Sequence, residues 1–274
     1  MILKFHFRTA PESVDFLIAM MIDLPFTAFE EVEEGFVTAV QEADWKVKDQ
    51  EFIDQLQRNV HFNYSVVKEE PQNWNAIWES GFKEIIIDSF CTIRAPFHKT
   101  SAESTYEIVI EPRMAFGTGH HETTRLMVRS MQKISLIGKQ ALDFGSGSGI
   151  LAILAVKMGA NPVFAVESDE QAVVNLLENI RYNNTDEITA RCNDQLVDFP
   201  TTIFDVVLAN ITRNVLMDHA NELRRITKKN GTLTLSGFLS KDHDVILQTF
   251  KQADFEPIFF LEENDWIAQT FKKL

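Results

Sequence analysis

The chain has 274 residues, 45% of them hydrophobic and 24% charged, a composition that is typical of a folded globular protein and excludes disordered and fibrous chains. With 26 Lys and Arg against 40 Asp and Glu, the net charge of -14 repels phosphate backbones and anionic lipid, so nucleic acid is not expected as a direct ligand. The longest apolar runs, 16–22 and 150–156, are far shorter than the ~20 residues that a membrane-spanning helix needs.

The cellular compartment is predicted from the cysteines and from the first residues of the sequence. Cys91 and Cys192 are the two cysteines, and they stand far apart. The sequence also begins without the basic start, apolar stretch and small-residue cleavage site of a secretory signal. We therefore expect a reducing, cytoplasmic location.

Residues 1–69 are expected to form a small α+β domain. The periodicity predicts, in chain order, a strand at 3–7, a helix at 11–21, a hairpin of 28–32 and 36–40, a helix carrying Phe52, Ile53, Leu56 and Val60, and a strand at 61–67. This order is that of a ferredoxin-like fold. Residues 1–60 carry 12 acidic and 5 basic residues, a net of -7, which indicates either a solvated surface or a face for a basic partner.

Residues 70–99 are interpreted as a connecting region. Trp74, Trp78 and Phe82 recur at four-residue spacing, which is more typical of a helix face packed in a core than of a ligand site. A β-rich stretch from Glu84 to Ile93 follows.

Residues 100–274 are expected to form a doubly wound α/β domain, because strands alternate with helices along this part of the chain. Seven strands are predicted, at 140–144, 163–166, 188–192, 204–209, 232–236, 258–261 and 266–271. The last two strands are too close in sequence for a crossover helix, so they should pair antiparallel as a hairpin. The sequence thus predicts a mostly parallel, seven-stranded, Rossmann-like sheet with one antiparallel strand.

The first of these strands runs into a glycine-rich turn and then into an apolar helix. Gly145 and Gly147 would permit a sharp turn and a close ligand, and Gly149 would permit close packing of the helix on a strand. Dinucleotide-binding folds require a third glycine at the position of Ile150, so NAD is not expected. The spacing, with Asp143 ahead of it, resembles the first motif of S-adenosylmethionine-dependent methyltransferases, whose cationic cofactor favours nearby carboxylates.

Polar residues after the next three strands are further candidates for this site. Glu167 ends the second strand, where its carboxylate could accept hydrogen bonds from a ribose diol, or could simply be a charge at the start of a helix. Asp194 follows the third strand, in a loop that either reaches an adenine ring or is a surface turn. Asn210 ends the fourth strand beside the cofactor slot and is the candidate catalytic residue, since its amide oxygen could orient an amine, although helix capping is the alternative.

The segment 114–125 contains a tight loop with two glycines ahead of a helix. Thr123 or Thr124 could cap that helix. Adjacent His120 and His121 cannot easily bind one metal ion together, and no third ligand is suitably spaced, so no metal site is predicted.

Four segments together resemble the ribosomal protein L11 methyltransferase family. They are 116–125 (FGTGHHETTR), 142–153 (LDFGSGSGILAI), 209–211 (ANI) and 235–237 (LSG), and the 73–82 region and the small N-terminal domain also match the family's layout. The resemblance implies methylation of lysine side chains and the N-terminal amine of a basic large-subunit ribosomal protein, with the N-terminal domain gripping that protein. It also implies that Thr118 and His120 contact the cofactor. The sequence departs from the family at Arg113, where Gly is usual, and at Glu167, where Asp is more common.

Two other functions share the same cofactor residues. One is a methyltransferase acting on a small molecule or on another protein. The other is an adenosine-type sensor without turnover, in which the acidic domain serves as a protein docking surface. Transfer of a labelled methyl group to an acceptor distinguishes all three.

Overall fold

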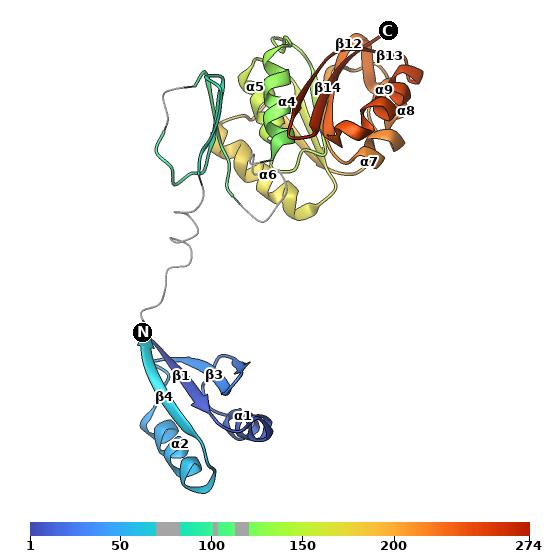
Figure 1. Cartoon of the computed structure of the whole chain (residues 1–274). Coiled ribbons are helices and arrows are strands. Elements are labelled where there is room, and N and C mark those ends of the chain that lie inside the picture. Colours follow the sequence, from blue (N-terminus) through green and yellow to red (C-terminus); the bar gives the residue numbers. More distant parts are fainter. Residues whose placement is uncertain (70–82, 101–103, 113–120) are drawn as a thin grey trace. The chain divides into compact units, whose positions relative to one another are not determined.

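The structure is a computed structural model that describes residues 1–69, 83–100, 104–112 and 121–274 (Figure 1). The chain divides into two compact units, 1–81 and 82–274. The predicted tryptophan stripe at Trp74 and Trp78, with Phe82, lies outside the described residues. No helix within the described ranges is long and apolar enough to cross a membrane.

The N-terminal unit is a four-stranded antiparallel sheet with two helices, as predicted. Its elements are β1 (Ile2–Arg8), α1 (Val14–Met21), β2 (Phe29–Val32), β3 (Gly35–Gln41), α2 (Val47–Asn59) and β4 (Asn63–Glu69), with a 3-10 turn at Pro11–Ser13 ahead of α1. The strand order β2-β3-β1-β4 is ferredoxin-like. Aromatic rings fill its core: Phe7 stacks on Phe36 with ring centroids 4.8 Å apart, and both side chains are almost fully buried.

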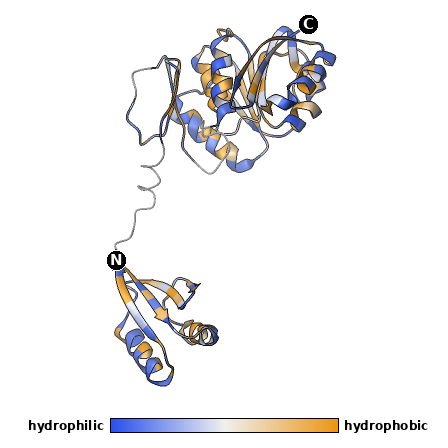
Figure 2. Ribbon diagram, in the orientation of Figure 1, coloured by the Kyte–Doolittle hydropathy of each residue, from blue (hydrophilic) through white to orange (hydrophobic). Residues whose placement is uncertain are grey.

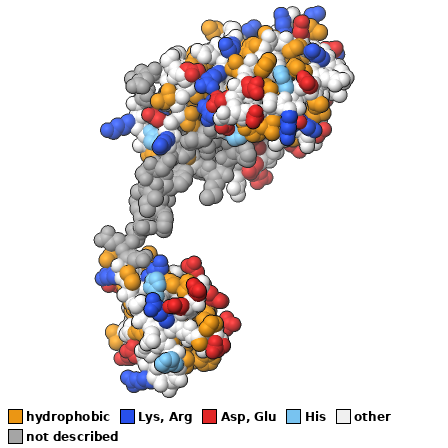
Figure 3. Space-filling view, in the orientation of Figure 1, with side chains coloured by type: hydrophobic (Ala, Val, Ile, Leu, Met, Phe, Trp, Pro, Cys, Tyr) orange, Lys and Arg blue, Asp and Glu red, His pale blue; other side chains and the backbone are white. Residues whose placement is uncertain are grey.

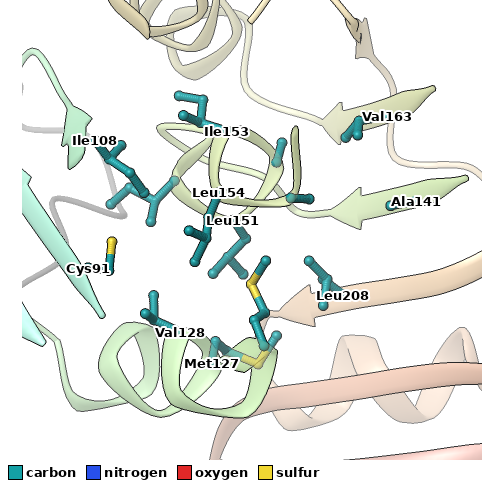
Figure 4. Packing of buried hydrophobic residues seen from close by; sticks show 14 of the residues in the cluster. Cys91, Ile108, Met127, Val128, Ala141, Leu151, Ile153, Leu154, Val163 and Leu208 are labelled. Atoms are coloured by element: carbon teal, nitrogen blue, oxygen red, sulfur yellow. The ribbon is translucent and has the colours of Figure 1, made fainter. Parts of the chain in front are cut away.

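A small three-stranded sheet begins the second unit, and it includes the stretch predicted to be β-rich. It consists of β5 (Ile85–Ile87), β6 (Cys91–Arg94) and β7 (Tyr106–Val109), in the order β5-β6-β7. Its buried residues belong to the same hydrophobic core as the helices that pack on the seven-stranded sheet of this unit. Figure 4 shows this core, in which Cys91 and Ile108 from the small sheet lie near Val128, Leu151 and Leu154.

The large sheet has seven strands, as the sequence predicts. They are β8 (Ala141–Phe144), β9 (Val163–Glu167), β10 (Ile188–Cys192), β11 (Phe204–Asn210), β12 (Thr227–Leu239), β13 (Phe255–Glu263) and β14 (Trp266–Lys273), in the order β10-β9-β8-β11-β12-β14-β13. β14 pairs antiparallel with both β12 and β13, whereas the other pairs in this sheet are parallel, so the predicted hairpin is confirmed. The chain leaves β8 toward β9 on one side and returns at β11 on the other, which places a topological switch point between β8 and β11.

Helices cover both faces of the large sheet. Buried residues of α4 (Glu122–Gln132), α5 (Ile150–Lys157) and α6 (Glu170–Asn183) belong to one core cluster, whereas those of α7 (Arg213–Asp218), α8 (Ala220–Ile226) and α9 (His243–Gln252) belong to another. Each strand contributes side chains to both clusters because successive side chains point to opposite faces of the sheet, as those of Ala141 and Leu142 do. The covering helices carry both hydrophobic and hydrophilic residues (Figure 2). The fold is therefore the doubly wound α/β architecture that the sequence predicts.

The predicted cap of α4 is wrong. His121, not Thr123 or Thr124, is the N-cap, and its Nδ1 accepts a hydrogen bond from the backbone N–H of Thr123 at 3.3 Å. Both threonines lie inside the helix and are buried. A neutral imidazole nitrogen can accept this hydrogen bond as a hydroxyl would, which preference rules based on Ser, Thr, Asp and Asn overlook.

Candidate functional site

The glycine-rich turn occupies the carboxyl end of β8, at the switch point. Gly145, Gly147 and Gly149 all have positive φ angles, of 72°, 51° and 84°, in the left-handed region that glycine adopts without steric cost. The backbone N–H groups of Gly145 and Ser146 both donate to the carbonyl of Val166, at 2.8 and 3.0 Å. These hydrogen bonds fold the turn back against β9.

Two of the glycines also lie close to neighbouring side chains, where a Cβ would force those side chains to move. A Cβ on Gly145 would lie 2.1 Å from Cγ2 of Ile211, and a Cβ on Gly149 would lie 2.2 Å from Cδ1 of Leu176. Leu176 belongs to α6, so Gly149 permits close packing of α5 on another helix. The expectation that Gly149 packs a helix on a strand is therefore wrong.

Asp143 is buried directly beneath the turn. Its Oδ2 accepts a hydrogen bond from the backbone N–H of Ala152 at 3.0 Å, which satisfies a donor in the first turn of α5 that Gly149, the N-cap, has no side chain to satisfy. Its Oδ1 has no hydrogen-bond partner in the described part of the chain. Burial raises the pKa of the Asp143 carboxyl to about 7; the Ala152 N–H opposes this rise, and the charge of Glu167 adds to it.

Glu167 places its carboxylate on the same turn from the end of β9. Oε2 accepts a hydrogen bond from the N–H of Gly147 at 2.8 Å, and Oε1 accepts from the N–H groups of Ser168 and Asp169 at 2.8 and 3.0 Å. The N-cap of α6 is Asp169, whose Oδ1 accepts from the N–H of Gln171. The capping role at α6 therefore belongs to Asp169, and the distinctive partner of Glu167 is the glycine-rich turn.

The loop after β10 is joined to the end of β9. The backbone N–H of Asn193 donates to the carbonyl of Glu167 at 2.8 Å, and its Oδ1 accepts from the N–H of Gln195 at 2.9 Å, which forms a side-chain turn. Asp194 is exposed beside these contacts. Asp194 therefore lies in a structured surface turn that adjoins Glu167.

Asn210 ends β11 on the other side of β8 and is half-buried. It pairs with Ser236 of β12, and the next residue, Ile211, donates its N–H to the Ser236 carbonyl at 3.2 Å. The N-cap of α7 is Thr212, so capping does not account for Asn210. The alternative structural role that the sequence left open for Asn210 is therefore wrong.

The sheet thus brings most of the predicted site residues to one edge. Asp143, Glu167, Asp194 and Asn210 lie at or just after the carboxyl ends of the adjacent strands β8 to β11, where open α/β sheets bind ligands. Thr118 and His120 lie outside the described residues. Among the residues that are described, no group of three or more His, Cys, Asp or Glu side chains is suited to hold a metal ion.

Comparisons with known proteins identify the family. The family model described as "Ribosomal protein L11 methyltransferase (PrmA)" matches residues 22–274. A ribosomal protein L11 methyltransferase of Bacteroides thetaiotaomicron is 35% identical over 274 residues, which cover 98% of each chain. This chain belongs to the ribosomal protein L11 methyltransferase (PrmA) family.

Two further relatives agree with this assignment to the PrmA family. The ribosomal protein L11 methyltransferase of Porphyromonas gingivalis is 38% identical over 211 residues, covering 77% of this chain and 73% of the relative. A crystal structure titled ribosomal protein L11 methylase, from Lactobacillus delbrueckii subsp. bulgaricus, superposes with a TM-score of 0.65 at 25% identity. It covers 70% of this chain and all of the solved chain. The resemblance noted from the motifs is therefore confirmed.

The cofactor of the PrmA family is S-adenosylmethionine, and the residues at the switch point suit it. Among the described residues, Asp143 has a buried carboxylate oxygen without a hydrogen-bond partner, and Ser146 of the turn has a buried hydroxyl that is likewise unpartnered. Buried polar atoms are normally paired, so unpaired ones at a turn indicate where a polar ligand belongs. Asp143, Glu167 and the glycine-rich turn are the described groups that would hold the cofactor.

Sequence reasoning missed three buried asparagines on α6. Asn175, Asn179 and Asn183 recur at four-residue spacing, and their side chains are 7% exposed or less. That spacing on a helix that also buries Leu176 and Ile180 is a signal visible in the sequence, because buried amides must find hydrogen-bond partners.

Proposed function

We propose that this protein transfers methyl groups from S-adenosylmethionine to amino groups of ribosomal protein L11, namely lysine side chains and the N-terminal amine. The observation that carries the proposal is a full-length match to relatives with this name, which spans both units of the chain. Its acidic balance favours a basic protein acceptor. Two free cysteines and a ribosomal substrate support a cytoplasmic location.

Positioning is the main task of the site in this reaction. When bound, S-adenosylmethionine supplies a methyl group on a sulfonium, a leaving group that is already activated. An acceptor lysine must lose its proton first: at an ordinary pKa of ~10.4, the neutral form costs about 4.6 kcal/mol at pH 7. Burying the amine at the crevice lowers that cost, because desolvation disfavours the charged form. The site then has to hold the neutral amine in line for attack.

Asn210 is the residue that we assign to hold the amine. Its half-buried side chain lies at the carboxyl edge of β11, beside the turn that follows β8. The amide oxygen can accept a hydrogen bond from an amine N–H and thereby direct the nitrogen lone pair. Asn210→Ala should therefore lower kcat about 100-fold, as loss of positioning does, whereas the Kd for S-adenosylmethionine should stay near that of the wild type.

Thr212→Ala provides the control for Asn210→Ala. Thr212 is the N-cap of α7 but makes no side-chain capping hydrogen bond, so truncating it tests whether a small change in this loop alone affects turnover. Thr212→Ala should retain kcat. A loss of cofactor affinity alone in Asn210→Ala, with kcat unchanged, would contradict the role assigned to Asn210.

The N-terminal unit is proposed to grip L11. Around α1 the side chains of Phe16, Met20 and Ile22 are 52%, 42% and 63% exposed. The exposed acids Asp15 and Asp23 are their neighbours in the sequence. Figure 3 shows acidic and hydrophobic side chains together on this unit. We call these five residues the α1 face. Exposed apolar groups within an acidic surround suit a basic protein that also offers apolar contacts.

The deciding experiment is methyl transfer from labelled S-adenosylmethionine to purified L11, with other basic ribosomal proteins of the large subunit as controls. We expect label on lysine and N-terminal amines of L11, located by mass spectrometry. Label on a small molecule or on a different protein would establish the alternative methyltransferase. Cofactor binding without transfer to any acceptor would establish a sensor.

A further inference from the structure

Buried asparagines of α6 contact two segments that are distant from them in sequence. Asn183 pairs with the free edge of β7: its Oδ1 accepts from the N–H of Val109 at 2.9 Å, and its Nδ2 donates to the carbonyl of Val109 at 2.7 Å. The side chain thus replaces a neighbouring strand at that residue. This contact anchors the small sheet to α6.

Asn179, one turn earlier on α6, makes a different pair of contacts. Its Oδ1 accepts from the N–H of Glu111 at 2.8 Å, and its Nδ2 donates to the carbonyl of Ser148 at 2.8 Å. The side chain is fully buried. One amide therefore connects the chain after β7 with the last peptide of the glycine-rich turn.

The bond to Ser148 fixes the orientation of the peptide between Ser148 and Gly149. While its carbonyl points to Asn179, its N–H points the opposite way, and it donates to the carbonyl of Ser146 at 2.8 Å. Gly149 has a φ of 84° and no Cβ, so its backbone can rotate more readily than that of any other residue type. The Asn179 amide is thus what opposes a flip of this peptide from the carbonyl side.

We propose that Asn179 is a positioning residue for cofactor binding, which holds the glycine-rich turn in its binding conformation through the Ser148 carbonyl. The proposal rests on the family's cofactor and is independent of the identity of the methyl acceptor. Asn179 acts through the turn and is not assigned any contact with the cofactor. Its bond to Glu111 keeps the amide oriented so that Nδ2 faces Ser148.

Asn179→Asp is the sharpest variant, because it changes one hydrogen bond of the pair. One carboxylate oxygen still accepts the hydrogen bond from the N–H of Glu111. The other replaces Nδ2 and faces the Ser148 carbonyl, which it repels. It therefore favours the flipped peptide, in which the N–H of Gly149 would donate to it. Measured by calorimetry at pH 8.5, the Kd for S-adenosylmethionine should rise about 10-fold or more. Asn179→Ala removes the hydrogen bond to the Ser148 carbonyl but does not stabilise the flipped peptide, so its Kd for S-adenosylmethionine should rise less, about 3-fold.

Asn183→Asp is the matched control, with the same chemical change on the same helix. It disturbs the hydrogen bonds from Nδ2 to the carbonyls of Val109 and Asn179, and within the described ranges its side chain has no bond to the turn. Its melting temperature should fall by about as much as that of Asn179→Asp, but its Kd for S-adenosylmethionine should stay within about 2-fold of wild type. An equal loss of affinity in both variants, or wild-type affinity in Asn179→Asp, would overturn the proposal.

Glu111→Pro tests the same connection from the other end and covers the case in which Asn179→Asp does not fold. Proline removes the N–H that donates to Asn179 and leaves both α6 and the turn unchanged in sequence. A raised Kd for S-adenosylmethionine is expected, and an unchanged one would overturn the proposal. Because all of these measurements use the cofactor alone, a failure to methylate L11 would leave them interpretable.

Discussion

Glu167 Oε2 lies 2.8 Å from the backbone nitrogen of Gly147, so the acid that ends β9 holds the glycine-rich turn that follows β8. The interaction is a charge-assisted hydrogen bond to a main-chain N–H. It joins the glycine-rich turn to the acid at the end of β9. These two parts of the predicted cofactor site are 20 residues apart in the sequence. Glu167 therefore shapes the turn in addition to presenting a carboxylate at the edge of the sheet.

Glu167→Ala should weaken S-adenosylmethionine binding by about 1.5 to 3 kcal/mol, the range for hydrogen bonds to a charged group. The structure adds that the variant should also loosen the turn, because the Gly147 N–H loses its acceptor. Calorimetry gives the affinity, and hydrogen exchange at Gly147 reports the turn.

Asp169→Ala is the control for Glu167→Ala, since it removes a neighbouring acid that caps α6 and that has, in the described part of the chain, no bond to the glycine-rich turn. It should lower the melting temperature and leave cofactor affinity nearly unchanged. If Asp169→Ala weakens cofactor binding as much as Glu167→Ala does, then Glu167 acts only as a negative charge near the start of α6.

The sequence predicted the sheet better than it predicted the contacts at its edge. Runs of apolar residues identify strands such as the one predicted at 204–209 and found at Phe204–Asn210, because a strand buried on both faces is made of apolar residues. By contrast, β12 begins at Thr227, whereas the sequence predicted this strand only from residue 232. Of this added stretch, Thr227 pairs with Phe204 of β11; the register then shifts, and pairing with β11 resumes, and with β14 begins, at Thr232. A pairing between residues so far apart in sequence cannot be read from local composition.

The same limit applies to the site. The position of Asp143 before a glycine-rich turn could be predicted, but its bond to Ala152 depends on how the turn sets α5 above β8. The element that packs against Gly149 was predicted wrongly, because Leu176 lies on α6, which is close to Gly149 in space but not in sequence. Asn179 was missed because its two partners lie 68 and 31 positions away in sequence.

Asp143 should make both stability and cofactor binding depend on pH. Its pKa is raised by burial to about 7 in the folded protein, so between about pH 4 and pH 7 the folded state binds a proton that the unfolded state has released. Stability from this group is therefore full below pH 4 and is lost as the pH rises through 7. The cationic cofactor favours the ionised form, so its affinity should rise over the same interval.

Asp143→Asn isolates this effect, because the amide oxygen can still accept from the Ala152 N–H. Without cofactor, the variant should melt at least about 4 °C above the wild type at pH 8, and this advantage should disappear at pH 4. Its affinity for S-adenosylmethionine should be lower at pH 8 and flatter with pH. A wild type whose affinity does not change between pH 6 and 8 would rule out this linkage.

Gly237→Ala should be far more damaging than Gly149→Ala. Gly237 has a φ of 95°, and a Cβ there would lie 2.2 Å from the backbone oxygen of Ile211, which cannot move without displacing the end of β11. At Gly149 the contacted atom is the end of the Leu176 side chain, which can change rotamer. We expect losses in unfolding free energy of about 3 kcal/mol or more for Gly237→Ala and about 1 to 3 for Gly149→Ala.

Chemical denaturation measures both losses. Gly237→Ala should in addition lower turnover, because Ile211 follows the candidate catalytic residue Asn210 directly. In the double variant of Gly149→Ala with Leu176→Ala the clashing side chain is gone, so the combined loss should be smaller than the sum of the single losses. Strict additivity would show that strain at φ of 84°, and not contact with Leu176, accounts for the cost.

The acidic α1 face predicts how L11 associates with the full chain. If this face guides a basic protein, Asp15→Lys with Asp23→Lys should slow association about tenfold at low salt, and the difference should shrink as salt screens the charges. Glu256→Lys with Glu262→Lys makes the same change in net charge at exposed sites on β13. That pair should slow association much less, and neither pair should alter the Kd for S-adenosylmethionine. Stopped-flow rates that fall equally for both pairs would show that overall charge, not the α1 face, attracts the substrate.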